Sequence, residues 1–308
     1  MIITLKDGST KEYSEPKSII EIAADISEGL ARMACAGEVN GEVEDLRTVI
    51  DKDCNLSILT FNDEGGKAAF RHTTSHIMAQ AIKRLYPDTK LAIGPSIADG
   101  FYYDVDRDTP LTSEDLEKIE AEMKKIVKSG LELERVELSP EEAEKKLEEM
   151  NEPYKVELVK EHSDKGEHIT FYKQGEFIDL CAGPHLMSVA PIKAIELTAC
   201  TGAYWRGDAN NAQLCRVYGV AFPKASMLEE PLKKLEEAKL RDHNKLGREL
   251  EYFTTVDYVG QGLPILLPKG ARVVQLLQRW VEDVEQSKGC LLTKTPLLAK
   301  RDLYKISG

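Results

Sequence analysis

Two pairs of residues carry side chains of the kinds that serve in hydrolysis and in metal binding. His72 and His76 lie four residues apart, and Cys181 and His185 also lie four residues apart. An imidazole can accept a proton from water, and imidazoles with a thiolate form a tetrahedral set suited to zinc. Each pair alone also has a plain interpretation: a satisfied or solvated histidine, and a buried free cysteine in a loop. We expect the two pairs to meet in one site.

A helix is needed to position the histidine pair. Apolar residues recur every three to four positions between about residues 67 and 86, which predicts a helix with one buried stripe. The stripe consists of Met78, Ile82 and Leu85. His72 and His76 fall on nearly the opposite side, with Gln80 and Lys83, and should face a cleft or water. Their imidazoles can converge on one point, because residues four apart in a helix are neighbours.

A short strand should position the second pair. Residues 175–180 are typical of a strand with Phe177 buried, and Gly183-Pro184 then forces a turn. This turn would direct His185 back towards the end of the strand. A glycine in such a turn also lets backbone amides approach a ligand closely.

Composition limits the class of protein. The chain has 308 residues and a net charge of -12, which argues against a general nucleic-acid binder but not against a local basic groove. The six cysteines have no Cys-x-x-Cys spacing, so a zinc finger is not expected. Neither a membrane-length apolar segment nor a signal peptide is evident. We therefore expect a cytoplasmic protein with reduced thiols.

The first part of the chain, residues 1–62, is typical of a small binding or spacing module. Asp7-Gly8 between two apolar runs predicts a hairpin, and Ser18 is placed to cap a helix that continues to about residue 30. Short strands are expected at residues 34–39, 48–50 and 56–60. A hairpin, a helix and returning strands indicate a β-grasp module, and Gly65-Gly66 marks its boundary.

The middle of the chain supplies further candidates. Tyr103 and Asp104 lie beside turn residues, where polar side chains can line a cleft. Lys155 is a candidate for the site, whereas His162 and His168 are predicted to lie on the surface. The segment 201–208 has two interpretations: a strand and turn that plug the core, or an aromatic platform that stacks on a nucleotide.

The last part of the chain should contain a linker and a third domain. Residues 224–246 are typical of one charged, amphipathic helix between domains. After it, we expect a helix at residues 271–288 and a buried strand at 290–296.

Together these motifs resemble threonyl-tRNA synthetases of the bacterial type. In chain order they are the β-grasp module, His72-x-x-x-His76, Gly94-Pro95 with residues 100–104, Cys181-x-Gly183-Pro184-His185, residues 202–208, Arg241-Asp242-His243 and Leu246-Gly247. Alanyl-tRNA synthetases usually carry Cys-x-Gly-Thr-His, so Pro184 favours the threonyl branch.

The resemblance implies an α+β, multi-domain chain. Its parts would be a TGS (β-grasp) domain at residues 1–62, an editing domain at 63–223, a linker helix at 224–246 and the truncated start of a class II catalytic domain at 247–308. The editing domain of this family hydrolyses seryl-tRNA(Thr). The full-length enzyme would attach threonine to tRNA(Thr) as a homodimer, with ATP, Mg and Zn.

The resemblance also assigns the site residues. A second, smaller sieve is needed because one methyl group gives only about 10–200-fold selectivity in a single pocket. His72 or Lys155 would polarise the attacking water, and His76 and Asp179 would orient water and substrate. The remaining site residues, which would bind substrate and shape the pocket, are Tyr103, Cys181 and His185. If zinc is bound there, its ligands would be His72, His76, Cys181 and His185, although the threonyl branch works with water and side chains alone.

Departures from the family pattern leave two alternatives open. Ala182 stands where the family commonly has arginine, and motifs 2 and 3 of the class II domain are absent, so this chain should not activate threonine. We therefore expect a fragment of a longer synthetase. The alternatives are a free-standing deacylase that edits in trans and a non-catalytic tRNA-binding module.

Overall fold

The computed structural model describes residues 1–260 and 262–307. The chain divides into two compact units, Met1–Pro231 and Leu232–Gly308, and its mixture of helices and strands confirms the α+β class. Gly308, the predicted end of the catalytic-domain fragment, lies outside the described residues. The predicted domain boundaries at residues 62, 223 and 246 stay predictions. Within the described residues, no helix is long and apolar enough to span a membrane.

The first module is built on a five-stranded sheet in the order β2-β1-β7-β4-β5. The hairpin predicted around Asp7-Gly8 is present, and β1 runs parallel to β7. The strands of this module are β1 (Ile2–Leu5), β2 (Thr10–Glu12), β3 (Lys17–Ser18), β4 (Ala34–Val39), β5 (Glu42–Glu44), β6 (Val49–Ile50) and β7 (Cys54–Thr60). Buried side chains between the sheet and a helix form its core, chiefly Ile3, Ile19, Ile22, Leu46 and Leu56.

The single helix predicted from Ser18 to about residue 30 is wrong in one respect. Ser18 does cap α1 (Ile19–Ile26), in a capping box with Glu21. However, Ser27 has extended backbone angles and its side chain accepts the amide of Gly29, so a second helix, α2 (Glu28–Met33), begins there. A serine that caps the next helix ends the first one.

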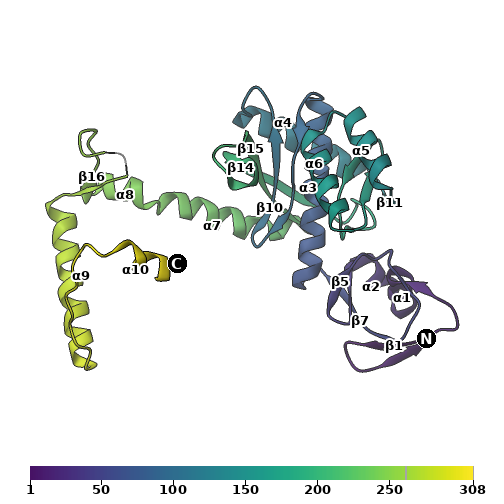
Figure 1. The fold of residues 1–308 in the computed structure, drawn as a ribbon. Coiled ribbons are helices and arrows are strands. Elements are labelled where there is room, and N and C mark those ends of the chain that lie inside the picture. Colours follow the sequence, from purple (N-terminus) through teal and green to yellow (C-terminus); the bar gives the residue numbers. More distant parts are fainter. Residues whose placement is uncertain (261, 308) are drawn as a thin grey trace. The chain divides into compact units, whose positions relative to one another are not determined.

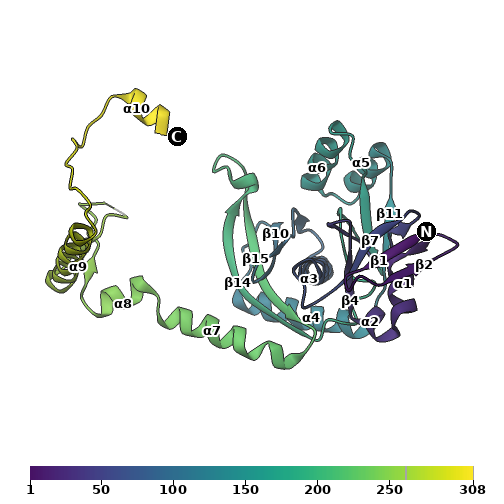
Figure 2. The same ribbon diagram turned by 90° about the horizontal axis from the view of Figure 1, so that it is seen from below.

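Helix α3 (Glu64–Leu85) occupies the centre of the first unit. It packs against β4 and β7 of the first module and against α4, β10 and β15 of the next, and Figure 2 shows it end-on among these elements. The predicted single buried stripe is wrong, because residues on all sides of the helix, including Thr74 and Gln80, are buried, whereas Leu85 is 37% exposed. Because strands and a helix pack against α3 on several sides, the helix has no single buried face.

Gly65 and Gly66, which were predicted to mark the boundary of the first module, lie in the first turn of α3. A Cβ atom on Gly66 would lie 1.9 Å from the carbonyl oxygen of Thr60. Glycine is therefore required here so that the helix can approach the end of β7.

Two further sheets surround α3 in the second half of this unit (Figure 1). One has the order β14-β15-β10-β8 with β9 paired to β10, and the other is β11-β12-β13. Their strands are β8 (Lys90–Leu91), β9 (Ser96–Ile97), β10 (Gly100–Asp106), β11 (Leu133–Glu137), β12 (Thr170–Gln174), β13 (Phe177–Leu180), β14 (Ala194–Tyr204) and β15 (Gln213–Phe222). The helices are α4 (Ser113–Ser129), α5 (Pro140–Glu149), α6 (Pro153–Asp164), η1 (Trp205–Gly207) and η2 (Ala225–Met227).

Two features of the β14–β15 hairpin bear on the sequence predictions. Cys200 and Cys215 form a disulfide across the two strands, so the expectation that all thiols are reduced is wrong for this pair. Their Cα atoms are 6.5 Å apart, because the two residues are diagonal neighbours in the ladder. Trp205 is buried and donates to Glu157, which agrees with the core interpretation for this residue, whereas Tyr204 is 43% exposed.

The second unit is described by itself. The helix predicted at residues 224–246 is broken: α7 (Glu229–Leu240) ends before Asp242, which caps α8 (His243–Glu249). A short ladder of β16 (Phe253–Thr254) and β17 (Ile265–Leu266) precedes α9 (Pro268–Ser287), and α10 (Arg301–Ser307) follows. The buried strand predicted at residues 290–296 is wrong, since Leu291 is 91% exposed and the segment pairs with no strand among the described residues.

Candidate active site

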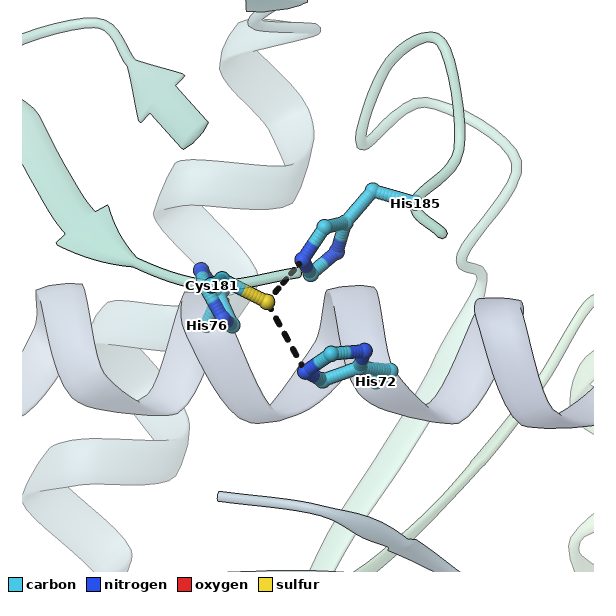
Figure 3. Close-up of side chains that lie close together, drawn as sticks. All are labelled: His72, His76, Cys181 and His185. Carbon is cyan, nitrogen blue, oxygen red and sulfur yellow. Dashed lines mark hydrogen bonds between the residues drawn. The ribbon is translucent and has the colours of Figure 1, made fainter. Parts of the chain in front are cut away.

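The structure brings the two residue pairs together (Figure 3). The Sγ atom of Cys181 lies 3.3 Å from Nε2 of His72 and 3.2 Å from Nε2 of His185. The ring centre of His76 lies 4.3 Å from that of His185 and 5.2 Å from that of His72. One nitrogen or sulfur atom from each of the four residues lies within 4.8 Å of all the others. The four side chains therefore form one cluster.

Local structure explains why the cluster forms. His72 and His76 project from the same side of α3, one turn apart, as the spacing predicts. Cys181 comes directly after β13, and the turn at Gly183-Pro184, which has a cis peptide bond, returns the chain so that His185 contacts the thiol. Gly183 has a φ of +82°, a backbone conformation that favours glycine.

Thr73, which lies between the two helical histidines, fixes the orientation of His185. Its hydroxyl donates to the carbonyl of Ala69, accepts the amide of Leu186 and lies 3.2 Å from Nδ1 of His185. Because the hydroxyl proton is already used, Nδ1 of His185 carries the proton and donates to Thr73. Nε2 of His185 is then the unprotonated nitrogen, and it faces Cys181.

A second group of buried polar side chains lies beside the cluster. The Nζ atom of Lys155 is 3.0 Å from Oδ1 of Asp179, and the hydroxyl of Tyr103 donates to Oδ2 of the same carboxylate at 2.6 Å. His76 Nε2 is 3.8 Å from Oδ2 of Asp179. Lys155 comes from the first turn of α6, Tyr103 from β10 and Asp179 from β13. Asp179 thus connects the ammonium group to the histidine cluster.

A cavity of about 420 Å³ opens next to these residues. Small-molecule sites commonly have volumes of about 300–1,000 Å³. Of the predicted site residues, those that line the cavity are His72, His76, Tyr103, Lys155 and Cys181. His185 and Asp179 are buried behind this lining and do not belong to it.

The cavity wall also contains residues to which the sequence assigned no role. They include Ile93, Gly94, Pro95 and Ser96, and also Ala182, which is exposed. His162 and His168, predicted as surface residues, are 41% and 83% exposed and also line the cavity. Both are therefore surface residues that also form its rim.

Burial determines the protonation states in the cluster. It lowers the pKa of His72 to about 3 and of His76 to about 4, and it lowers the pKa of His185 well below 6.5. All three imidazoles are therefore neutral at pH 7. Burial also raises the pKa of the Cys181 thiol to about 12, so this group is protonated and is not a nucleophile by itself.

The carboxylate of Asp179 behaves differently. Burial would raise its pKa, but Lys155, His76 and the Tyr103 hydroxyl together lower the pKa below the usual 3.8. The site at neutral pH accordingly contains a buried ion pair beside neutral imidazoles.

The four clustered residues have the chemistry of a zinc site. With bonds of about 2.0–2.1 Å to nitrogen and 2.3 Å to sulfur, tetrahedral zinc needs ligand atoms about 3.3–3.6 Å apart. The two distances from Cys181 to the imidazoles, 3.3 and 3.2 Å, are close to this separation. The contact between Thr73 and His185 would be a typical outer hydrogen bond of a ligating histidine. The donor types therefore fit a metal ion, and the four ligand atoms, which lie within 4.8 Å of one another, would have to move closer together to reach the tetrahedral separation.

Three residues that support the cluster were not predicted from the sequence. They are Asp45, Thr73 and Tyr172. Thr73 could have been found from its place between the two histidines in a helix. No local signal marks Asp45 or Tyr172, which reach the site only through the tertiary structure.

Comparison with known proteins agrees with the motifs. The TGS domain model matches residues 1–60, and the model described as threonyl and alanyl tRNA synthetase second additional domain matches residues 169–218. The chain is 60% identical over 306 residues to a threonine–tRNA ligase of Clostridium botulinum (strain Alaska E43 / Type E3), which covers 99% of the chain and 47% of the relative. A threonine–tRNA ligase of Clostridioides difficile (strain 630) is 51% identical over 306 residues, 99% of the chain and 48% of the relative. The chain spans about half the length of the curated relatives it matches.

Proposed function

We propose, from the premise that this chain belongs to the threonine–tRNA ligase family and corresponds to its N-terminal region, that its cavity hydrolyses seryl-tRNA(Thr). One observation carries the proposal: the neutral imidazole of His72 and the ammonium group of Lys155 line the same cavity. These two groups could hold a water molecule and the ester carbonyl of an aminoacyl-tRNA.

The chemistry follows from the charges. An ester carbonyl gains negative charge when water attacks it, and a fixed positive charge nearby stabilises that charge. Lys155 supplies the charge and Asp179 fixes the position of its Nζ atom. His72 is neutral and can accept a hydrogen bond from water, and His76 lies where it would orient the same water or the substrate. A pKa near 3 makes His72 a weak base, so its expected role is to position and polarise water.

Tyr103, Cys181 and His185 would shape the pocket and bind the substrate. Tyr103 donates to Asp179, and Gly94 packs directly on its ring, where a Cβ atom would lie 2.2 Å from a ring carbon. Discrimination between serine and threonine would come from the size of the space between these groups. A methyl group that does not fit is rejected by about 10–200-fold.

Hydrolysis of seryl- and threonyl-tRNA by the purified chain tests the proposal. We expect seryl-tRNA to be hydrolysed faster than threonyl-tRNA, and we expect His72→Ala and His76→Ala to slow the reaction by about 100-fold. His243→Ala, in the second unit, is the matched control and should leave the rate unchanged. Hydrolysis at the wild-type rate in both site variants would refute the assignment.

Zinc in this site is a second question. If it is bound, the ligands would be His72, His76, Cys181 and His185, and the ion would supply a Lewis acid to the cavity. Metal analysis of the purified chain, with Cys181→Ser as the control, answers it. One equivalent of zinc that the variant loses would show that the site holds metal.

The complete protein would catalyse the reaction that gives its relatives their name, the ligation of threonine to tRNA. We propose that it attaches threonine to tRNA(Thr) with ATP, Mg and Zn, that it acts as a cytoplasmic homodimer, and that residues 247–308 begin its class II catalytic domain. Aminoacylation assays on the full-length protein, with and without ATP, test this. The isolated chain should edit without activating threonine.

A further inference from the structure

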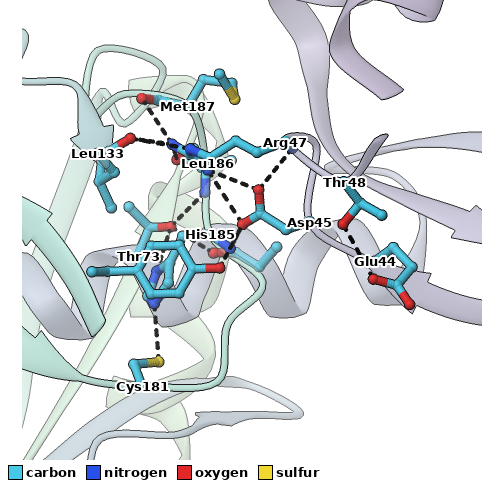
Figure 4. Close-up of polar contacts among 12 residues, drawn as sticks. Glu44, Asp45, Arg47, Thr48, Thr73, Leu133, Cys181, His185, Leu186 and Met187 are labelled. Atoms are coloured by element: carbon cyan, nitrogen blue, oxygen red, sulfur yellow. Dashed lines mark hydrogen bonds and ion pairs between the residues drawn. The ribbon is translucent and has the colours of Figure 1, made fainter. Parts of the chain in front are cut away.

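The first module touches the candidate site through two residues of the loop between β5 and β6. These are Asp45 and Arg47, which lie in the part of the chain that the TGS model matches. Asp45 is buried, and the side chain of Arg47 is 17% exposed. Asp45 contacts His185 itself, and Arg47 contacts the residues that follow it (Figure 4).

The carboxylate of Asp45 holds the turn directly. Its Oδ2 atom accepts the backbone amide of His185 at 3.1 Å and the hydroxyl of Tyr172 at 2.8 Å. Tyr172 in turn lies against the turn, because a Cβ atom on Gly183 would be 2.4 Å from its hydroxyl oxygen. The ring centres of Tyr172 and His185 are 4.3 Å apart. One carboxylate therefore fixes both the backbone of His185 and the aromatic ring that packs on it.

Arg47 fixes the carboxylate and the segments on either side of it. Its Nη1 atom donates to Asp45 Oδ1 at 2.9 Å, and its Nε and Nη2 atoms donate to the carbonyl of Leu133. Nη2 also lies 3.0 Å from the carbonyl oxygen of Leu186 and 3.3 Å from that of Met187. The guanidinium group thereby ties the first module to β11 and to the residues that follow His185.

We propose that Asp45, held by Arg47, is a positioning residue of the hydrolytic site, so that the first module completes this site in addition to any binding role of its own. The proposal rests on the proposed function, since it names a residue that acts through His185 and Cys181. Asp45 does not line the cavity, and His185 Nε2 contacts the Cys181 thiol that does. Loss of the carboxylate would release the His185 amide and the Tyr172 hydroxyl at once.

Buried charge supports a role in positioning rather than in stability alone. A buried ion pair contributes little net stability compared with apolar side chains of the same size, because both charges lose their hydration. Here one carboxylate oxygen of Asp45 accepts the His185 amide and the Tyr172 hydroxyl, and the other accepts Arg47, so the pair holds these groups in one geometry. Misplacement of a catalytic group by about 1 Å can cost about 100-fold in rate.

The test uses the whole chain with Asp45→Ala, Asp45→Asn and Arg47→Lys. Asp25→Ala is the matched control, because Asp25 belongs to the same module and pairs there with Lys17. The kinetic measurements are kcat and KM for seryl-tRNA hydrolysis. The structural measurements are the rate of hydrogen exchange at the His185 amide and the rate of Cys181 alkylation by iodoacetamide, which is followed by peptide mass. The exchange and alkylation readouts do not need an active enzyme.

We expect Asp45→Ala to lower kcat by about 10- to 100-fold with KM within about twofold, and to accelerate exchange and alkylation. Asp45→Asn keeps one acceptor oxygen and should show a smaller fall in kcat, which a general loss of folding would not produce. Arg47→Lys serves where Asp45→Ala does not fold, and should also lower kcat. Asp25→Ala should match the wild type.

The outcomes separate the two proposals. Wild-type kcat in the folded Asp45 and Arg47 variants overturns the positioning role, whatever the exchange rates show. If the wild-type chain itself does not hydrolyse seryl-tRNA, the proposed function fails, and exchange at His185 then decides the positioning role. Unchanged exchange and alkylation in that case would overturn it as well.

Discussion

Replacing Asp179 with asparagine isolates the electrostatic role of the buried Lys155–Asp179 pair. The two side chains are almost completely buried, with residue exposures of 4% and 2%. Asparagine has the same shape and can still accept the hydroxyl of Tyr103, whose bond to Asp179 is 2.6 Å long. The change therefore removes a charge and leaves the hydrogen-bond acceptor in place.

The expected magnitude follows from the loss of one charge of a buried pair. An uncompensated buried ammonium group destabilises a protein by about 3–5 kcal/mol. For a unit of this size, that loss lowers the Tm by about 10 °C. A second substitution, Lys155→Met, removes the remaining charge and should restore at least about 2 kcal/mol, because an apolar chain replaces the unpaired ammonium group.

The assay combines urea unfolding at pH 7 with hydrolysis of seryl-tRNA. The Asp179→Asn chain should have a lower free energy of unfolding than the wild type and should hydrolyse seryl-tRNA more slowly. The double variant should recover stability but hydrolyse seryl-tRNA about 100-fold more slowly than the wild type, since it lacks the positive charge that stabilises the developing oxyanion. An Asp179→Asn chain as stable as the wild type would refute the energetic reasoning. A double variant with wild-type kcat would refute the catalytic role of Lys155.

Two further predictions concern pH and tRNA affinity. Because the pKa of His76 falls from 6.5 to about 4 on folding, the unfolded chain binds the extra proton between these values, and stability is lost as the pH falls below 6.5. Between pH 7 and pH 5, His76 should lower the free energy of unfolding by about 2 kcal/mol. His76→Gln should remove this contribution, so the urea midpoints at pH 7 and pH 5 should differ less than in the wild type. An equal difference in both chains would contradict the prediction. Ala182→Arg adds a cation to the cavity wall, so the KM for seryl-tRNA should fall about fivefold. The slope of log KM against log salt concentration should increase by the amount expected for about one additional phosphate contact. An unchanged KM at low salt would show that residue 182 lies away from the nucleic acid.

Local patterns in the sequence were enough to predict that the two residue pairs, His72 with His76 and Cys181 with His185, meet in one cluster. The spacing of His72 and His76 predicts their convergence because a helix places residues four apart on one side. The Gly-Pro turn likewise predicts the return of His185 towards Cys181. No local pattern predicts the pairing of Lys155 with Asp179, because the two residues come from different elements and meet only in the tertiary structure.

Long-range packing explains what the sequence did not reveal. The burial of α3 on all sides depends on elements from both halves of the first unit, so its apolar periodicity was misleading. Asp45 contacts the amide of His185, 140 residues away, and no spacing rule predicts such a pair. The exposed segment at residues 290–296 has the composition of a strand, but composition does not provide the neighbouring strand that a ladder requires.

The close contact between Gly66 and Thr60 has a consequence for ligand recognition. Since the helix backbone touches the end of β7 and continues into the histidine cluster, no flexible tether separates the first module from the cavity. A large ligand that contacts both would meet a preorganised surface and lose little conformational entropy in aligning the two parts. A larger residue at position 66 would push α3 away from β7 and weaken the binding of such a ligand, even though residue 66 lies outside the histidine cluster.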